Sequence, residues 1–312
     1  MDRPISVLLL DDEADKMIDF IQEAKSERVL IKEKLTNAQE GIQEIRDNYD
    51  KYDAVILDAL FFEKPDSAKL RDAGALADTL AEISRLVHVE EKYLPHCIYT
   101  GHFDKVNSDT VTRNKEVFVK GRDQKKMFDY LKEEVSKSDD YAIKNKYNDV
   151  FEVFDRSFMP MDKMPDLIEI LAQLESDAKY NRDGAFTPLR KMYEAFVKSF
   201  YDEAYANDQD QDLVPLDLFY GDNDERVNIK GSWFYFSGME IRDRNGRTIV
   251  SQRSEPVFPE HIKNLTSGFV DLVQTESHDY PEPVTKYAYR SAVNTLLELL
   301  LWYKNFCIEN FK

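Results

Sequence analysis

The stretch Asp53-Ala54-Val55-Ile56-Leu57-Asp58 decides the fold of the first half of the chain. Three apolar residues in a row, with β-branched Val55 and Ile56, predict a strand that is buried on both faces. The apolar run ends abruptly at Asp58. In an open parallel α/β sheet, ligands gather at the carboxyl ends of the strands. We therefore expect Asp58 to lie at a functional edge of a sheet.

Four more strand patterns surround this stretch. Residues 5–10 form a second continuous apolar run, residues 28–35 are typical of an outer strand, and residues 97–100 and 117–120 predict two short strands. Apolar residues at helical spacing predict helices between them, at residues 17–24, 38–49, 68–87 and 127–135. Because strands and helices alternate with short connections, we predict an α/β fold with a five-stranded parallel sheet covered on both faces.

Polar residues stand at the carboxyl ends of these strands. Asp11 and Asp12 end the first strand, Asp58 the third, Thr100 the fourth and Lys120 the fifth. With the strand order 2-1-3-4-5, the first and third strands are neighbours, so three carboxylates would meet beside a hydroxyl and an ammonium group. Carboxylates at short range repel one another, and Mg²⁺ is the hard cation that would offset this repulsion. A carboxylate, Mg²⁺ and a lysine are also the parts that accept a phosphoryl group.

A structural explanation competes with this one. A single aspartate at a strand end more often caps a helix or fills a turn, since its short side chain bonds the backbone nearby. Five suitable polar residues at the right strand ends favour a site over five separate caps.

These five residues, in this order, resemble the site of a response-regulator receiver domain, and the resemblance covers residues 5–135. It implies a flavodoxin-like, doubly wound sheet in which a histidine kinase or a phosphotransfer protein phosphorylates Asp58. It also implies that Asp12, Asp58 and the main-chain carbonyl of Leu60 bind Mg²⁺ directly, with Asp11 acting through water. Thr100 would then contact a phosphate oxygen after switching, and Lys120 would pair with the phosphoryl group.

Three features depart from the family pattern. A proline in a cis bond usually follows the family lysine, whereas Gly121 follows Lys120 here, which predicts a more mobile loop. An aromatic switch residue usually lies three positions before that lysine, where this chain has Val117. Phe118 comes one place later, and a shift of one residue in a strand reverses the face. Residues 61–65 lengthen the connection after the third strand and predict a functional loop beside the site.

The second half of the chain is organised differently. We predict a receiver domain over residues 1–136, a polar linker over 137–150 and a mainly helical output or interaction domain with one β-hairpin over 151–312. Within the second half, apolar spacing predicts helices over residues 147–158, 164–178, 188–205, 261–273 and 284–311. The hairpin is expected from an apolar, aromatic strand over 233–241, the turn Arg244-Asn245-Gly246-Arg247 and a returning strand over 248–250.

This second half faintly resembles HEPN-type helical domains, which are often RNases in defence systems. The likeness lies in an arginine-bearing helix over residues 182–201 and a long last helix that contains Arg290 and Asn294. Active members place a histidine several residues after the arginine, and no histidine follows Arg290. The pattern therefore favours a dimerising or binding role over nuclease activity.

The charge of the chain restricts its partners. It has 60 acidic and 42 basic residues and a net charge of −18. Binding to nucleic acid depends on lysine and arginine that neutralise phosphates, so a polyanion is disfavoured as the main partner. A helix-turn-helix output that reads DNA is disfavoured as well, because no basic recognition helix is present. We expect the chain to bind other proteins, and a second copy of the chain, in a homodimer, is one candidate partner.

The cysteines and apolar runs indicate the compartment. Cys97 and Cys307 stand far apart and belong to no CxxC pair, which is typical of a protein in a reducing cytoplasm. The start of the chain does not have the pattern of a signal peptide. The longest apolar run, residues 296–302, is broken by Glu298 and is too short to span a bilayer. We therefore expect a cytoplasmic protein with no membrane contact.

Together these observations predict a two-component response regulator in which phosphorylation of Asp58 controls an atypical helical output domain. We expect a signalling phosphoprotein rather than an enzyme. Two alternatives stay open. The second half can be a receiver-gated effector enzyme that acts on RNA or a nucleotide in a stress or phage-defence system, or the receiver can be a decoy that accepts phosphate without relaying a signal.

Overall fold

A computed structural model of the chain describes residues 3–62, 71–89, 93–101, 112, 115–176, 180, 184–206, 219–220, 226–242, 246, 248–250, 255–275 and 285–311. The chain divides into two units: unit 1 is Met1–Lys146 and unit 2 is Tyr147–Lys312. Among the described residues, no helix combines the length and the apolar character that crossing a membrane requires.

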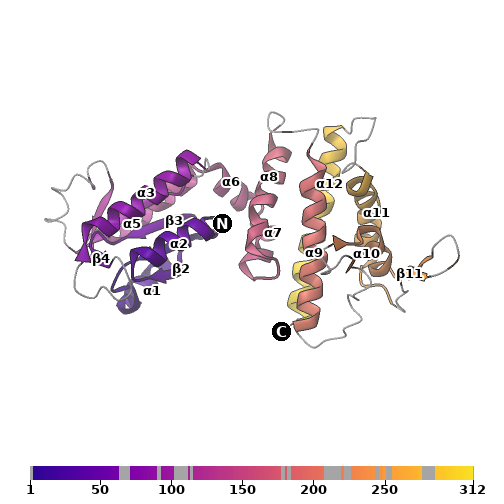
Figure 1. Ribbon diagram of the computed structural model, residues 1–312, viewed down its shortest axis with the longest axis horizontal. Helices are drawn as coiled ribbons and strands as arrows, with labels where there is room; N and C mark the ends of the chain where they lie inside the picture. The colour runs from indigo at the N-terminus through magenta and orange to yellow at the C-terminus, as the bar shows by residue number, and fades with distance from the viewer. Residues whose placement is uncertain are drawn as a thin grey trace. The chain divides into compact units, whose positions relative to one another are not determined.

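Unit 1 is built on a parallel sheet (Figure 1). Its elements are β1 (Ile5–Leu10), η1 (Ala14–Lys16), α1 (Ile18–Ser26), β2 (Val29–Leu35), α2 (Ala38–Asn48), η2 (Tyr49–Lys51), β3 (Ala54–Leu57), β4 (Phe61–Phe62), β5 (Arg71–Asp72), α3 (Ala73–Val89), β6 (His96–Thr100), β7 (Val117–Val119), α5 (Gln124–Ser136) and α6 (Asp139–Lys146). The five sheet strands are ordered β2-β1-β3-β6-β7, and every neighbouring pair is parallel. The predicted five-stranded parallel sheet, with its strands in the order 2-1-3-4-5, is confirmed.

Both faces of the inner strands are packed against helices. Alternate residues of β1, among them Leu8 and Leu10, lie in one apolar cluster with residues of α2 and α3. The residues between them, Val7 and Leu9, lie in a second cluster with residues of α1 and α5. Because side chains alternate across a strand, strands with two covered faces must be apolar throughout. This explains why β3 is apolar throughout and why β1 is apolar except at Ser6.

The connection after β3 differs from the expected loop. β4 and β5 pair as a short antiparallel ribbon, in which Phe61 lies opposite Asp72 and Phe62 opposite Arg71. As a result α3 begins at Ala73 and not near residue 68. Strands of two residues contain too few positions to show a period of two, so the sequence pattern did not reveal them. Residues 63–70 of the predicted loop lie outside the described residues.

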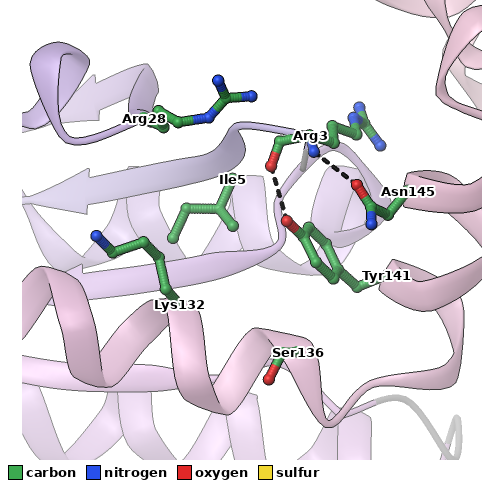
Figure 2. A pocket seen from close by; sticks show the side chains of 7 residues that line it. All are labelled: Arg3, Ile5, Arg28, Lys132, Ser136, Tyr141 and Asn145. Atoms are coloured by element: carbon green, nitrogen blue, oxygen red, sulfur yellow. Dashed lines mark hydrogen bonds between the residues drawn. The ribbon is translucent and has the colours of Figure 1, made fainter. Parts of the chain in front are cut away.

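The segment predicted as a linker, residues 137–150, is instead largely helical. Asp139–Lys146 forms α6, which belongs to unit 1, and α7 of unit 2 begins at Asn148. α6 is held against the start of β1 (Figure 2), where the Tyr141 hydroxyl donates to the Arg3 carbonyl at 2.7 Å and the Arg3 N–H donates to Asn145 Oδ1 at 2.6 Å. These bonds close one side of a hollow of about 550 Å³. The charged surface of this segment resembled a linker, but its contacts are those of a packed helix.

Unit 2 is mainly helical, as predicted. Its elements are α7 (Asn148–Asp155), η3 (Met161–Lys163), α8 (Met164–Glu175), α9 (Phe186–Ala206), β8 (Phe219–Tyr220), β9 (Arg226–Val227), α10 (Ile229–Phe236), β10 (Ile241–Arg242), β11 (Thr248–Val250), α11 (Glu260–Thr275) and α12 (Lys286–Asn310). Buried aromatic rings form much of its core. The Phe196 ring, for example, lies 5.2 Å from Tyr303 and 6.2 Å from Phe236.

The hairpin predictions for unit 2 are partly right. β10 and β11 pair antiparallel on either side of the predicted turn. The expected first strand over residues 233–241 is wrong over most of its length, because Ile229–Phe236 forms α10, which Asn228 caps by accepting from the Gly231 N–H at 2.9 Å. A second antiparallel pair, β8 with β9, shows that unit 2 does not have a single hairpin. Apolar runs of this length suit a buried helix turn as well as a strand.

Candidate functional site

The residues that follow the strands of the sheet are aligned by backbone hydrogen bonds. The Asp58 N–H donates to the Leu10 carbonyl at 2.8 Å, which places Asp58 beside the end of β1. At the next strands, the Lys120 N–H donates to the Thr100 carbonyl at 2.9 Å. Since these bonds continue the parallel ladders past the last paired residues, the polar residues come to one edge of the sheet.

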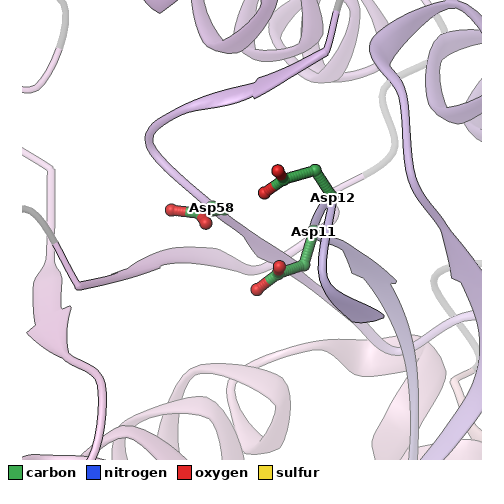
Figure 3. A group of neighbouring side chains, drawn as sticks. All are labelled: Asp11, Asp12 and Asp58. Carbon is green, nitrogen blue, oxygen red and sulfur yellow. The ribbon is translucent and has the colours of Figure 1, made fainter. Parts of the chain in front are cut away.

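Three carboxylates converge at this edge (Figure 3). Asp11, Asp12 and Asp58 each offer an oxygen, and these oxygens lie within 4.8 Å of one another. Asp11 and Asp58 are buried, whereas Asp12 is half-buried. The Asp11 side chain is oriented by the Glu13 N–H, which donates to Oδ1 at 2.9 Å. The structure thus brings together the three acidic residues that the sequence pattern singled out.

Lys120 is the cation of this cluster. Its Nζ lies 2.7 Å from Asp58 Oδ2 and 2.6 Å from Asp11 Oδ2, so one ammonium group bridges two carboxylates. A third carboxylate, that of Asp12, belongs to the same group. When all four side chains are ionised, the negative charges exceed the positive charge at a site that is largely withdrawn from water.

The pKa values of Asp11 and Lys120 are shifted by burial and by the neighbouring charges. Burial raises the pKa of Asp11; the charge of Lys120 offsets part of that effect, and the charge of Asp58 adds to it. Burial by itself would lower the pKa of Lys120, but the charges of Asp58 and Asp11 outweigh it and raise the pKa above its ordinary value. Lys120 is therefore held in its charged form, whereas ionisation of Asp11 costs more free energy in the folded protein than in water.

The donor set fits a metal ion. Asp11 Oδ2 is buried and, apart from its ion pair with Lys120, accepts no hydrogen bond. Carboxylate oxygens grouped at such short range are the ligands that hard divalent cations take. The acidic cluster can therefore hold a metal ion. Among the described residues, it is the one group of three acidic, histidine or cysteine side chains close enough to do so.

Leu60 and Thr100 complete the set of predicted site residues. The Leu60 N–H donates to Asp58 Oδ1 at 3.4 Å, which places this residue next to the acidic cluster. That its carbonyl binds a metal stays a prediction. Thr100 is fully buried and is the last residue of β6. Both residues thus flank the carboxylates along the same sheet edge.

The two residues before Val119 point to opposite faces. Val117 packs against the cluster that contains α2 and α3, whereas Phe118 belongs to the cluster with α1 and α5, where its ring lies 5.5 Å from Tyr130. The aromatic side chain of β7 is therefore on the face opposite to the expected switch position. Gly121, which follows Lys120, has a φ of +75°, a conformation that glycine adopts without strain.

Sequence reasoning missed Tyr99, which lies beside the site. Its hydroxyl accepts from the Gly121 N–H at 3.2 Å and donates to Gln124 Oε1 at 3.0 Å. In the sequence, Tyr99 is one more apolar residue of a short strand, and nothing in its spacing indicates a polar contact. The only available signal was its position directly before Thr100.

The structure describes two of the residues on which the HEPN resemblance was based. Arg290 is half-buried and Asn294 is exposed, both on α12. Arg182 lies outside the described residues.

The chain was also compared with known proteins. A scan against protein-family models found no match, and a search of curated proteins found no similar sequence. The sheet and the side chains at its edge are therefore the features that bear on function.

Proposed function

We propose that unit 1 is a doubly wound, flavodoxin-like receiver domain and that the chain is a response regulator phosphorylated on Asp58 with Mg²⁺ as cofactor. The observation that carries this proposal is the joint placement of Asp11, Asp12 and Asp58 within 4.8 Å, with Lys120 paired to two of them. The cognate donor would be a histidine kinase or a phosphotransfer protein.

The arrangement of the side chains suits phosphoryl transfer. A carboxylate oxygen of Asp58 would attack the phosphorus of an acyl or histidyl phosphate and form a new P–O bond. The bond from phosphorus to the leaving carboxylate or imidazole would break, and its electron pair would go to that leaving group. Asp12, Asp58 and the Leu60 carbonyl would hold Mg²⁺, with Asp11 bound through water. The bound ion would offset the charge of the phosphoryl oxygens. Positioning and charge neutralisation supply most of the catalysis in such reactions.

Lys120 and Thr100 would act after the transfer. Lys120 already bridges two carboxylates, so a small movement would let its ammonium pair with a phosphoryl oxygen instead of Asp58. The Thr100 hydroxyl would donate to another phosphoryl oxygen. The phosphoryl group carries about two negative charges at pH 7 in place of the single charge of the Asp58 carboxylate, and this change would shift the population of a surface that these residues support.

Unit 2 would be the output domain and would act through protein partners. The excess of 60 acidic over 42 basic residues supports a protein rather than a nucleic acid as its target.

The test is incubation with Mg²⁺ and acetyl phosphate, followed by intact-mass measurement. We expect a phosphate-sized mass increase in the wild type and none in Asp58→Asn, which keeps the shape of the side chain. Asp53→Asn is the matched control, because Asp53 is a buried carboxylate at the other end of the same strand. It should still be phosphorylated, provided circular dichroism shows that it is folded.

Size-exclusion chromatography of the same samples tests the output. A change in elution that depends on Asp58 would show that the rest of the chain responds to phosphorylation. If no mass increase appears in the wild type, the proposed function is wrong.

A further inference from the structure

The turn between β7 and α5 carries Lys120, and its backbone groups are held by hydrogen bonds of two kinds, within the turn and to β6. The Val119 carbonyl accepts from the Arg122 N–H at 3.1 Å and the Asp123 N–H at 3.0 Å. The Gly121 N–H points elsewhere and donates to the Tyr99 hydroxyl at 3.2 Å. Gly121 has a φ of +75°, and a Cβ added to it would have no atom within 4 Å, so no side chain packs at that position. The hydrogen bond to Tyr99 is the contact that holds the Gly121 N–H.

Tyr99 is itself held firmly. Its ring stacks on Phe20 with the centroids 5.2 Å apart, and the residue is only 2% exposed. Its hydroxyl donates to Gln124 Oε1 at 3.0 Å, and Gln124 Nε2 donates to Glu23 Oε2 at 2.9 Å. Burial raises the pKa of the phenol, so it stays protonated and keeps its donor bond at neutral pH. The hydroxyl is thus a fixed acceptor for Gly121.

The last two residues of β6 hold the lysine turn at two adjacent points. The Thr100 carbonyl accepts from the Lys120 N–H at 2.9 Å, and the Tyr99 hydroxyl accepts from the next N–H, that of Gly121. From this backbone position, Lys120 Nζ reaches Asp58 Oδ2 at 2.7 Å. Loosening the Gly121 contact would free the residue directly after Lys120, and with it the direction in which the lysine side chain leaves the strand.

We propose that Tyr99 is a positioning residue that holds the Lys120–Gly121 turn, and so keeps the ammonium group of Lys120 at the phosphoryl-transfer site. This inference rests on the proposed function. It adds a residue to the site that does not touch the reacting atoms, since Tyr99 acts through the backbone of Gly121. Tyr99 thereby supplies the restraint that a flexible glycine after the lysine cannot.

The test compares Tyr99→Phe with the wild type in the full chain. Phenylalanine keeps the ring that stacks on Phe20 and removes only the hydroxyl. We expect phosphorylation by acetyl phosphate at saturating Mg²⁺ to slow by roughly tenfold, as for a catalytic group displaced by part of an ångström. Mg²⁺ affinity, measured by calorimetry with the metal alone, should not fall, because the three carboxylates follow other strands and lose only a competing positive charge.

Tyr141→Phe is the matched control. It also removes one tyrosine hydroxyl and one hydrogen bond, which Tyr141 donates to the Arg3 carbonyl at 2.7 Å. Arg3 precedes β1, so this bond lies at the opposite end of that strand from Asp11. Its phosphorylation rate should equal that of the wild type. Gln124→Leu is a second variant, which leaves the Tyr99 hydroxyl in place without its acceptor. We expect an intermediate rate, and this variant carries the test if Tyr99→Phe fails to fold.

Exchange of the Gly121 amide hydrogen, followed by NMR, gives a readout independent of the reaction. It should be faster in Tyr99→Phe than in the wild type. An unchanged phosphorylation rate in Tyr99→Phe would overturn the inference, as would a parallel loss of Mg²⁺ affinity, which would indicate a general loosening of the site. A wild type that takes up no phosphoryl group would overturn the proposed function instead, and Tyr99 would then be a structural residue only.

Discussion

The two ends of strand β3 each carry a buried aspartate paired with a lysine, yet the pairs differ in balance. At the start of the strand, Asp53 Oδ1 lies 3.4 Å from Lys144 Nζ, and Asp53 Oδ2 accepts from the Ser6 N–H at 2.8 Å. At the other end, Asp58 shares Lys120 with Asp11, and Asp12 joins them. At the first end one carboxylate forms an ion pair with one lysine, whereas at the second two carboxylates share one lysine and a third lies within 4.8 Å of them.

This difference separates a structural ion pair from a site. Asp53 and Lys144 satisfy each other and neighbouring backbone groups, and together they join α6 to the sheet. A balanced, hydrogen-bonded pair has no need of a further ion. At the Asp58 end, burial raises the pKa of Asp11 and the charge of Asp58 adds to this effect, and a bound cation would offset both. Both ends thus bury an aspartate, and they differ in the number of carboxylates grouped around one lysine.

The largest effect on stability is expected at the Asp53 end of β3. Lys144→Met leaves Asp53 buried without its partner, and we expect it to lower the free energy of unfolding of unit 1 by about 3 kcal/mol. Phosphorylation of Asp58 should be unaffected. Hydrogen exchange of the β1 and β3 amides measures unit 1, while the fluorescence of Trp233 and Trp302, both in unit 2, serves as an internal reference. Slower phosphorylation in this variant would contradict the separation of the two ends.

Mg²⁺ should stabilise unit 1 by binding at the Asp58 end of β3 and not at the Asp53 end. At a concentration one hundred times its Kd, the ion should raise the free energy of unfolding of unit 1 by about 2.7 kcal/mol. The same gain is expected in Lys144→Met and none in Asp58→Asn. Chelation with EDTA should reverse it. A gain that survives Asp58→Asn would place the metal elsewhere.

Lys120→Met should lower the free energy of unfolding of unit 1 by less than Lys144→Met does. The Lys120 side chain is 23% exposed, so solvent screens part of the loss, and we expect about 2 kcal/mol without metal. Mg²⁺ should restore most of this stability, because it supplies the missing positive charge, while phosphorylation stays slow. Lys125→Met, a change of an exposed lysine on α5, is the control and should have almost no effect.

Asp11→Asn should give the smallest effect, and of opposite sign. The pKa of Asp11 is raised on folding, so the folded state binds its proton more tightly, and stability falls as the pH rises from the unfolded pKa through the folded one. Asparagine removes this cost, so the variant should be more stable than the wild type by about 1 kcal/mol at pH 7. Unfolding curves between pH 3 and 7 should show the difference growing with pH. A difference that is constant with pH would show that Asp11 is not the titrating group.

The acidic cluster could be predicted from the sequence because it depends on strand ends. A continuous apolar run such as Val55-Ile56-Leu57 stops where the chain leaves the sheet, and in parallel strands these stops meet at one edge. The role of Tyr99 could not be predicted in this way. Its hydroxyl meets the Gly121 N–H across 22 residues of chain, and no local period records such a contact.

The local sequence determined where the strands of the sheet run and which polar residues end them, because burial on both faces requires unbroken apolar runs. Tertiary structure alone decided three other features: the β4–β5 ribbon, the helical conformation of Ile229–Phe236, and the docking of α6. Short segments have too few residues for a periodic pattern, so their conformation follows from the partners that they meet in the folded chain. The same holds for charge. The sequence shows both Asp53 and Asp58, but only the fold shows how many carboxylates lie around the lysine that each aspartate contacts.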